Sequence, residues 1–144
     1  MESDRRGLKH WDLTERIIGV FFDVYNELGH GFLESVYEEA MAIALTQKGI
    51  EVGRQIPLKV AFRGTVVGEF RADMLVEKAV LLEMKAARAL DLSHEAQLLN
   101  YLRATEIEVG LLLNFGPKPL FKRLAFETPG NKSAFIRVDS RPGV

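Results

Sequence analysis

Three charged residues lie in a segment that otherwise has the composition of apolar strands. They are Asp73, Glu83 and Lys85, within residues 70–87. Residues 79–86 alternate as in a buried β-strand, where side chains two positions apart share a face. Glu83 and Lys85 therefore point the same way, roughly 7 Å apart at about 3.3 Å per residue. Burying a carboxylate and an ammonium carries a desolvation cost, and a functional site is the usual reason for it.

Asp73 joins this site if the chain forms a hairpin. A hairpin is expected because an apolar run follows Asp73 and Glu77-Lys78 can then make a tight turn. In an antiparallel hairpin Asp73 lies beside Glu83, and two carboxylates converge. Such hard oxygen ligands suit Mg²⁺ or Mn²⁺, whose remaining positions are filled by water and substrate phosphate. Lys85 would then orient the attacking water or offset charge that builds on phosphorus. A structural ion pair at a sheet edge is the alternative that these residue types leave open.

Several short motifs stand around these residues in a fixed order. They are GFLESVY at residues 31–37, GEFRAD at 68–73, LEMK at 82–85, HEAQLLNY at 94–101 and VGLLLNFG at 109–116. In this order the chain resembles the GxxExxY protein family, a compact branch of the PD-(D/E)xK nuclease-like superfamily. The resemblance spans roughly residues 14 to 126, which is most of the chain.

The resemblance implies roles for five residues. Asp73, Glu83 and Lys85 fall on the D…(D/E)xK signature of the superfamily. Glu34 corresponds to the acidic residue of the preceding helix, and Gln97 to the polar position of the helix after the core. By this likeness Asp73 and Glu83 hold Mg²⁺ or Mn²⁺, and Glu34 joins them directly or through water. Lys85 positions the nucleophile with support from Gln97.

Two further positions complete the comparison with the superfamily. The backbone carbonyl of Met84 is implied as an additional metal ligand. Ala72 stands where the name of the superfamily has proline, but that position is loosely kept. The acidic and basic positions of the signature are intact, so the resemblance loses little.

Glu34 also has a simpler explanation. A carboxylate in the first turn of a helix interacts favourably with the helix dipole, and neighbouring Glu38 and Glu39 are equally acidic. If Glu34 faces the metal instead, Tyr37 on the same stripe either braces it or touches phosphate. Exposed Glu38 and Glu39 then serve as controls.

Several side chains around the signature could contact a nucleic-acid backbone or base. Arg71, Lys85, Arg88 and Arg103 could form a local basic patch, although most basic residues at this composition are solvated surface. Tyr101 could stack on a base, although a tyrosine on a core flank is the commoner finding. The predicted substrate contacts are Tyr37, Arg71, Arg88 and Tyr101.

The elements that position these residues follow from the periodicity of apolar residues. Helices are predicted at residues 12–28, 33–48 and 94–103. The first is opened by a capping box of Asp12 with Glu15, and the last is capped by Ser93. Strands are predicted at residues 56–62, 65–70, 74–76, 79–86, 107–115 and 120–126, the last at a sheet edge.

The predicted fold class is α/β, a PD-(D/E)xK restriction-endonuclease-like core. A helical crossover makes the strands at 79–86 and 107–115 parallel, so the sheet is mixed, with four to six strands and flanking helices. Residues 12–128 form this domain, residues 1–11 a flexible tail and residues 129–144 a partly ordered extension. Within that extension residues 134–138 could add one more short strand or a dimer arm.

Composition narrows the classes of function. A chain of 144 residues is expected to form one domain, without room for a separate binding domain. The lack of cysteine excludes thiolate metal sites, and three scattered histidines make no zinc cluster, so a metal must be bound by oxygen. The net charge of −1 argues against a tight, non-specific nucleic-acid coat. Without a signal-peptide pattern or an apolar run of membrane length, a cytoplasmic protein is expected.

The leading hypothesis is metal-dependent hydrolysis of a nucleic-acid phosphodiester, with DNA favoured over RNA. Retention of Asp, Glu and Lys at the three signature positions supports it. The rival hypothesis is a binding or regulatory module that keeps the nuclease fold without turnover, favoured by the near-neutral charge and the lack of extensions that grip a duplex. A homodimer whose two sites act on opposite strands is a further hypothesis.

Overall fold

The computed structural model describes residues 10–127 and 135–142, with side chains described up to residue 125. In these residues the helices are α1 (Trp11–Leu28), α2 (Glu34–Gln47) and α3 (Leu92–Ala104). The strands are β1 (Val52–Phe62), β2 (Thr65–Val76), β3 (Val80–Lys85), β4 (Val109–Phe115), β5 (Pro119–Glu127) and β6 (Phe135–Pro142). No helix in this part of the chain is both long and apolar enough to cross a membrane.

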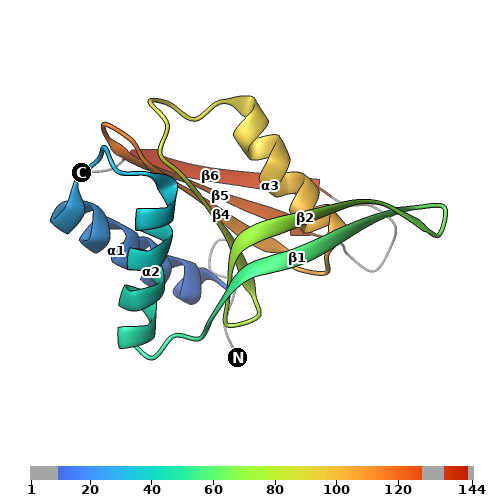
Figure 1. The fold of residues 1–144 in the computed structure, drawn as a ribbon, viewed down its shortest axis with the longest axis horizontal. Coiled ribbons are helices and arrows are strands. Elements are labelled where there is room, and N and C mark those ends of the chain that lie inside the picture. Colours follow the sequence, from blue (N-terminus) through green and yellow to red (C-terminus); the bar gives the residue numbers. More distant parts are fainter. Residues whose placement is uncertain (1–9, 128–134, 143–144) are drawn as a thin grey trace.

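The strands form a single mixed sheet, in which β1 to β6 lie side by side in chain order (Figure 1). Neighbouring strands are antiparallel except β3 and β4, which are parallel because α3 crosses over between them. The predicted α/β fold with a mixed sheet is confirmed, and the six strands of the described residues fall within the predicted range.

Two predictions about the strands are wrong, and β1 also begins four residues before the predicted start at Ile56. The sequence predicts separate strands at 65–70 and 74–76, but β2 runs unbroken through both, because Arg71 and Ala72 remain paired with β1. The sequence also predicts an edge strand at 120–126, whereas β5 lies inside the sheet and β6 pairs along its outer side. The extra strand suggested at 134–138 is therefore present, and it extends further than expected.

Helices cover both faces of the sheet. On one face Val80, Leu82 and Met84 of β3 join a buried cluster with α1 and α2. On the other face Leu81 joins a second cluster, with Leu98 of α3. The alternation predicted for residues 79–86 is confirmed, and it directs the odd-numbered residues of β3 toward α3.

The first helix begins one residue earlier than predicted. His10 occupies the N-cap position with a φ of 54°, and the Thr14 hydroxyl donates to the His10 carbonyl at 3.1 Å. Burial of Trp11, which is 6% exposed, draws it into the helix, so Asp12 lies inside the first turn. The predicted capping box of Asp12 with Glu15 is therefore wrong.

The third helix is capped by Asp91 rather than by Ser93. The Asp91 carboxylate accepts from the N–H groups of Ser93 and His94, at 2.9 and 3.3 Å. The His94 ring accepts from the Asp91 N–H at 3.1 Å, which completes a reciprocal capping box. Ser93 thus lies inside the first turn of α3.

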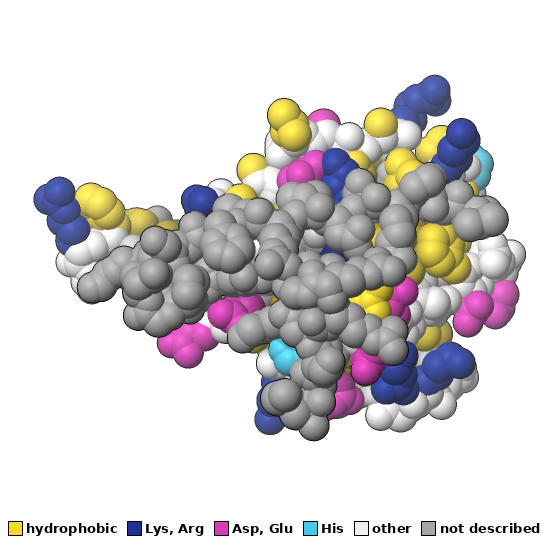
Figure 2. All heavy atoms as spheres, turned by 180° about the vertical axis from the view of Figure 1, so that it is seen from behind, with side chains coloured by type: hydrophobic (Ala, Val, Ile, Leu, Met, Phe, Trp, Pro, Cys, Tyr) yellow, Lys and Arg dark blue, Asp and Glu magenta, His cyan; other side chains and the backbone are white. Residues whose placement is uncertain are grey.

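β1 and β2 form a long hairpin that projects beyond the rest of the sheet (Figure 1). Its turn lies at Arg63-Gly64, as predicted, and both residues have positive φ. Phe62 and Val67 near this turn are 59% and 62% exposed, and the Arg63 guanidinium lies over the Phe62 ring. Hydrophobic and basic side chains stand together at this projecting end of the molecule (Figure 2).

Contacts from β4 and α1 fix the chain that leaves β3. Asn114 is fully buried, and its side chain accepts from the Ala87 N–H at 2.9 Å and donates to the Ala87 carbonyl at 3.0 Å. A Cβ on Gly116 would lie 2.2 Å from the Ala87 carbonyl oxygen. Tyr25 of α1 donates to the Gly116 carbonyl at 2.7 Å. Together these contacts set the direction in which the backbone continues beyond Lys85.

Replacing Gly116 by alanine should destabilise the fold, because the Ala87 backbone would have to move to admit a methyl group. We expect the free energy of unfolding to fall by on the order of 2–4 kcal/mol. Gly19 is the matched control, since nothing lies within 4 Å of the position that its Cβ would take in α1. Gly19→Ala should raise the free energy of unfolding by roughly 0.5–1 kcal/mol. Urea unfolding measures both, and equal effects would contradict this account of the loop.

Candidate functional site

Asp73 and Glu83 lie beside each other on β2 and β3, one step beyond the paired residues Met74 and Leu82. The Asp73 N–H donates to Glu83 Oε2 at 2.9 Å, and the Met84 N–H donates to Asp73 Oδ2 at 2.8 Å. Each carboxylate therefore accepts a backbone hydrogen bond from the strand that carries the other. These two bonds continue the contact between β2 and β3 where their regular pairing ends.

Burial makes both carboxylates harder to ionise than they are in water. Glu83 is 4% exposed, and burial together with the charge of Asp73 raises its pKa to about 8, against the opposing effects of the Asp73 N–H and Lys85. Burial also raises the pKa of Asp73, an effect that the Met84 N–H opposes. A bound cation stabilises two such adjacent carboxylates in their charged form. The donor set therefore fits a hard divalent cation such as Mg²⁺ or Mn²⁺.

Lys85 contacts α3 rather than the carboxylates. Its ammonium donates to Gln97 Oε1 at 2.9 Å, and Gln97 Nε2 donates to the Tyr101 hydroxyl at 3.3 Å. Within the described residues Lys85 forms no ion pair, yet its charge is close enough to lower the pKa of both Asp73 and Glu83. The structural ion pair that the sequence left open is therefore not formed. Instead α3 holds the lysine beside two carboxylates.

Glu34 is not gathered with this pair as a third ligand. It is exposed in the first turn of α2, where the helix-dipole explanation also applies. In the part of the chain that the structure describes, no group of three or more potential metal-ligating side chains occurs. The charge of Glu34 nevertheless raises the pKa of both Asp73 and Glu83. Its contribution through a bridging water stays a prediction, as does that of the Met84 carbonyl.

Glu38 is unsuitable as the exposed control that the sequence suggests. Its side chain is 13% exposed and accepts hydrogen bonds from Arg54 at 3.2 Å and from Gln55 at 3.0 Å. Gln55 stands on β1 with a φ of 51°, where the regular pairing with β2 is interrupted opposite Asp73. The charge of Glu38 also raises the pKa of Asp73. Glu38 therefore belongs to the surroundings of the carboxylate pair.

Tyr37 supports the fold and is not accessible as a substrate contact. It is fully buried, and its hydroxyl donates to the Gly29 carbonyl at 2.7 Å and accepts from the Phe32 N–H at 3.2 Å. Its ring stacks on Phe115, with 4.2 Å between ring centres. Because its surface is buried, Tyr37 holds the loop between α1 and α2 and cannot touch phosphate.

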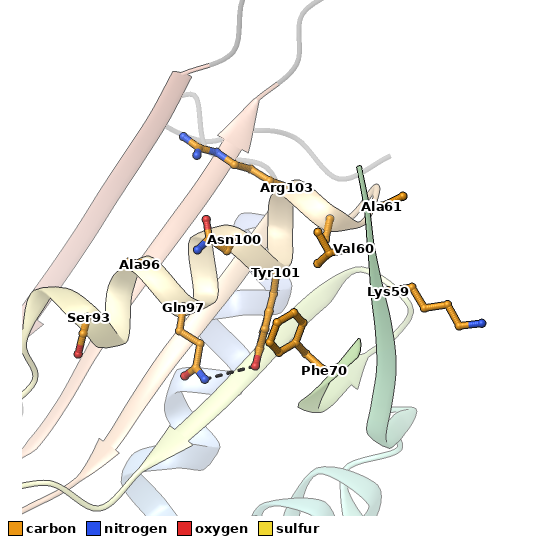
Figure 3. A pocket seen from close by; sticks show the side chains of 11 residues that line it. Lys59, Val60, Ala61, Phe70, Ser93, Ala96, Gln97, Asn100, Tyr101 and Arg103 are labelled. Carbon is orange, nitrogen blue, oxygen red and sulfur yellow. Dashed lines mark hydrogen bonds between the residues drawn. The ribbon is translucent and has the colours of Figure 1, made fainter. Parts of the chain in front are cut away.

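The predicted basic contacts lie on the surface. Arg71, Arg88 and Arg103 are exposed, and Arg71 donates to the Gln55 carbonyl at 3.3 Å. Arg103 lies at the far end of α3 and is directed away from Tyr101 (Figure 3). Contact between these arginines and a nucleic-acid backbone stays a prediction.

A groove of about 840 Å³ opens between α3 and the β1–β2 hairpin. Phe70 and Tyr101 pack against each other in it, with 5.9 Å between ring centres, and Gln97 of α3 stands beside the Tyr101 hydroxyl (Figure 3). Lys59 stands at its rim with its side chain directed away (Figure 3). No carboxylate occurs among the described residues that line this groove. Its walls therefore combine aromatic, aliphatic and amide surface with two basic residues, and Gln97 connects it to Lys85.

Comparison of the sequence with known protein families assigns the chain to a superfamily. A sequence model described as the PD-(D/E)XK nuclease superfamily matches residues 11–124, which include the carboxylate pair, the lysine and both faces of the sheet. The chain belongs to the PD-(D/E)XK nuclease superfamily. β2 and β3 bring together Asp73 and Glu83, which the sequence resemblance places on the acidic positions of the signature.

Other comparisons add little to this assignment. Among solved structures, the chain titled "Crystal structure of SSO0001" is 19% identical, with a TM-score of 0.47. The alignment covers 71% of this PD-(D/E)XK chain and 48% of that chain, so the present chain spans about half the length of that protein. No curated protein is similar enough to the sequence to count as a match.

Sequence reasoning missed several residues that surround the site. Asn114 carried a visible signal, because it is a polar residue inside an otherwise apolar strand. Phe70 carried a weaker one, as an aromatic residue three positions before Asp73. Gln55 carried none, and Glu38 was predicted only as an exposed control, because their contact joins α2 to β1 and no local pattern specifies it.

The raised pKa of Glu83 should make the metal-free protein less stable as pH rises. Between its ordinary value of 4.5 and about 8, the folded state keeps a proton that the unfolded state releases, so unfolding becomes easier through that window. Glu83→Gln has no such proton. As pH rises through this window, the difference in free energy of unfolding, Glu83→Gln minus wild type, should therefore increase by up to about 1.4 kcal/mol per pH unit.

Urea unfolding in EDTA across this pH window measures the difference. Glu69→Gln, which removes an exposed carboxylate elsewhere on β2, is the control and should follow the wild-type profile. Parallel profiles for wild type and Glu83→Gln would contradict the buried, protonated state of Glu83.

Proposed function

We propose that this protein is a divalent-metal-dependent nuclease that hydrolyses phosphodiester bonds of a nucleic acid. The observation that carries the proposal is the pairing of Asp73 and Glu83 beside a lysine that forms no ion pair with them in the described residues. Superfamily membership supports a nucleic acid as substrate. The chain also fits the GxxExxY branch, through Gly31, Glu34 and the buried Tyr37.

Asp73 and Glu83 are the residues that would hold Mg²⁺ or Mn²⁺, with Glu34 joining through water and Met84 through its carbonyl. When bound, such a cation lowers the pKa of a coordinated water and polarises a phosphoryl oxygen. The protein side chains contribute position and charge. Backbone N–H groups hold each carboxylate in place before any ligand arrives, so little reorganisation is needed.

Lys85 would orient the attacking water or offset charge on the phosphoryl group. Gln97 holds its ammonium from one side, and an ammonium has three donors, so the remaining donors can serve the substrate. Gln97 is a positioning residue in this scheme, because it acts through Lys85. DNA is favoured over RNA as the substrate, and a homodimer would bring two such sites to opposite strands.

A binding or regulatory module is the second candidate. It is favoured by the finding that the described residues contain no group of three potential metal ligands. It predicts nucleic-acid or protein binding without turnover, and the same assay separates the two.

Cleavage should require Mg²⁺ or Mn²⁺ and Lys85. We expect wild type to cleave single- or double-stranded DNA or RNA only with the metal, and Lys85→Ala to lower the rate by roughly 10²–10³-fold. Lys118→Ala, on the exposed loop between β4 and β5, should cleave like wild type. Gel analysis of labelled substrates measures the rates. A Lys85→Ala protein that cleaves at the wild-type rate would remove the lysine from the mechanism.

Metal binding is measured separately, by the shift of Tm on adding Mn²⁺. Asp73→Asn should lose that shift, because it removes a ligand, whereas Lys85→Ala should keep it. Cleavage that persists in EDTA would contradict the metal requirement, and a Tm shift without cleavage of any substrate would favour the binding module.

A further inference from the structure

We propose that the groove between α3 and the β1–β2 hairpin holds an unpaired nucleotide, whose base stacks on Phe70 next to the scissile phosphate. The substrate would then be a single strand, or a duplex locally opened at the site. This inference rests on the proposed function for the place of the phosphate, but the groove itself is a separate feature of the molecule.

The groove presents aromatic surface that folding alone does not require. Phe70 is 47% exposed although it lies on a strand, whereas Tyr101, against which its ring packs, is 7% exposed. The Phe70 ring lies over Gly68, where an added Cβ would come within 3.2 Å of the ring. Glycine at this position and the contact with Tyr101 together hold an exposed ring in a fixed place. A fixed, exposed aromatic face is the surface on which a nucleobase stacks.

The groove is also connected to the candidate catalytic centre. The Tyr101 hydroxyl accepts from Gln97, and Gln97 accepts from Lys85. The stacking wall and the lysine are therefore fixed to each other through one side chain of α3. A base in the groove would place its own backbone beside Lys85, because Gln97 both lines the groove and holds the ammonium.

The chemistry of the walls favours an unpaired base over an intact duplex. In a duplex the faces of the bases are covered by their neighbours, so an aromatic wall has nothing to stack on. Duplex binding through phosphates depends on many cations, but the chain has a net charge of −1, and the basic side chains at the groove are directed away from it (Figure 3). Asn100 of α3 also lines the groove, and its amide can bond a base edge.

The test measures binding of a fluorescein-labelled 12-nucleotide single-stranded DNA in EDTA, so that hydrolysis plays no part. Phe70→Leu keeps apolar volume without a stacking face and should raise Kd roughly fivefold to hundredfold. Phe62→Leu, at the exposed end of the same hairpin, is the matched control and should bind like wild type. A second arm uses a set of strands that each lack one base. The strand that lacks the stacked base should bind wild type most weakly, and wild type and Phe70→Leu should bind that strand with the same Kd.

Equal Kd values for wild type and Phe70→Leu, or equal losses in Phe70→Leu and Phe62→Leu, would overturn the inference. Tighter binding of the matching duplex than of the single strand would overturn it as well. If Phe70→Leu loses single-strand binding while wild type shows no metal-dependent cleavage, the groove is supported and hydrolysis is rejected. If cleavage is intact and Phe70→Leu binds like wild type, only the groove is rejected.

Discussion

The structure holds a buried and a half-buried carboxylate side by side where β2 and β3 cease to pair. Glu83 and Asp73 exchange hydrogen bonds with backbone N–H groups of the opposite strand, which lowers the cost of burying them. Burial still raises the pKa of both groups, and burial together with the charge of Asp73 raises that of Glu83 to about 8. Ionising both groups is unfavourable without a neighbouring positive charge, so a bound cation would favour the charged pair, and this links the fold to its proposed chemistry.

The surrounding elements act mainly as supports for this pair. Gln97 on α3 holds Lys85, and Asn114 on β4 holds the chain segment that follows β3. Tyr37, which the sequence suggested as a substrate contact, supports the loop between α1 and α2 instead. Because these supports belong to helices and strands, the charged groups are held on rigid elements, as a preorganised site requires.

Local patterns in the sequence were sufficient to predict the strand that carries the site. Alternation over residues 79–86 gave the faces of β3, and the turn at Glu77-Lys78 brought Asp73 beside Glu83. The caps of α1 and α3 were misplaced, because burial of Trp11 and the side chain of Asp91 outweighed the local signals. The groove and the partners of Glu38 were beyond prediction, since they join elements distant in sequence whose packing no local period specifies.

The central claim is that Asp73 and Glu83 share a divalent cation. Its most direct test is a crystal of the protein soaked in Mn²⁺ and measured at the manganese absorption edge. The account predicts an anomalous peak within bonding distance of both carboxylates, lost in Asp73→Asn. A structure without that peak, or with Lys85 moved into a salt bridge across the two carboxylates, would contradict the claim.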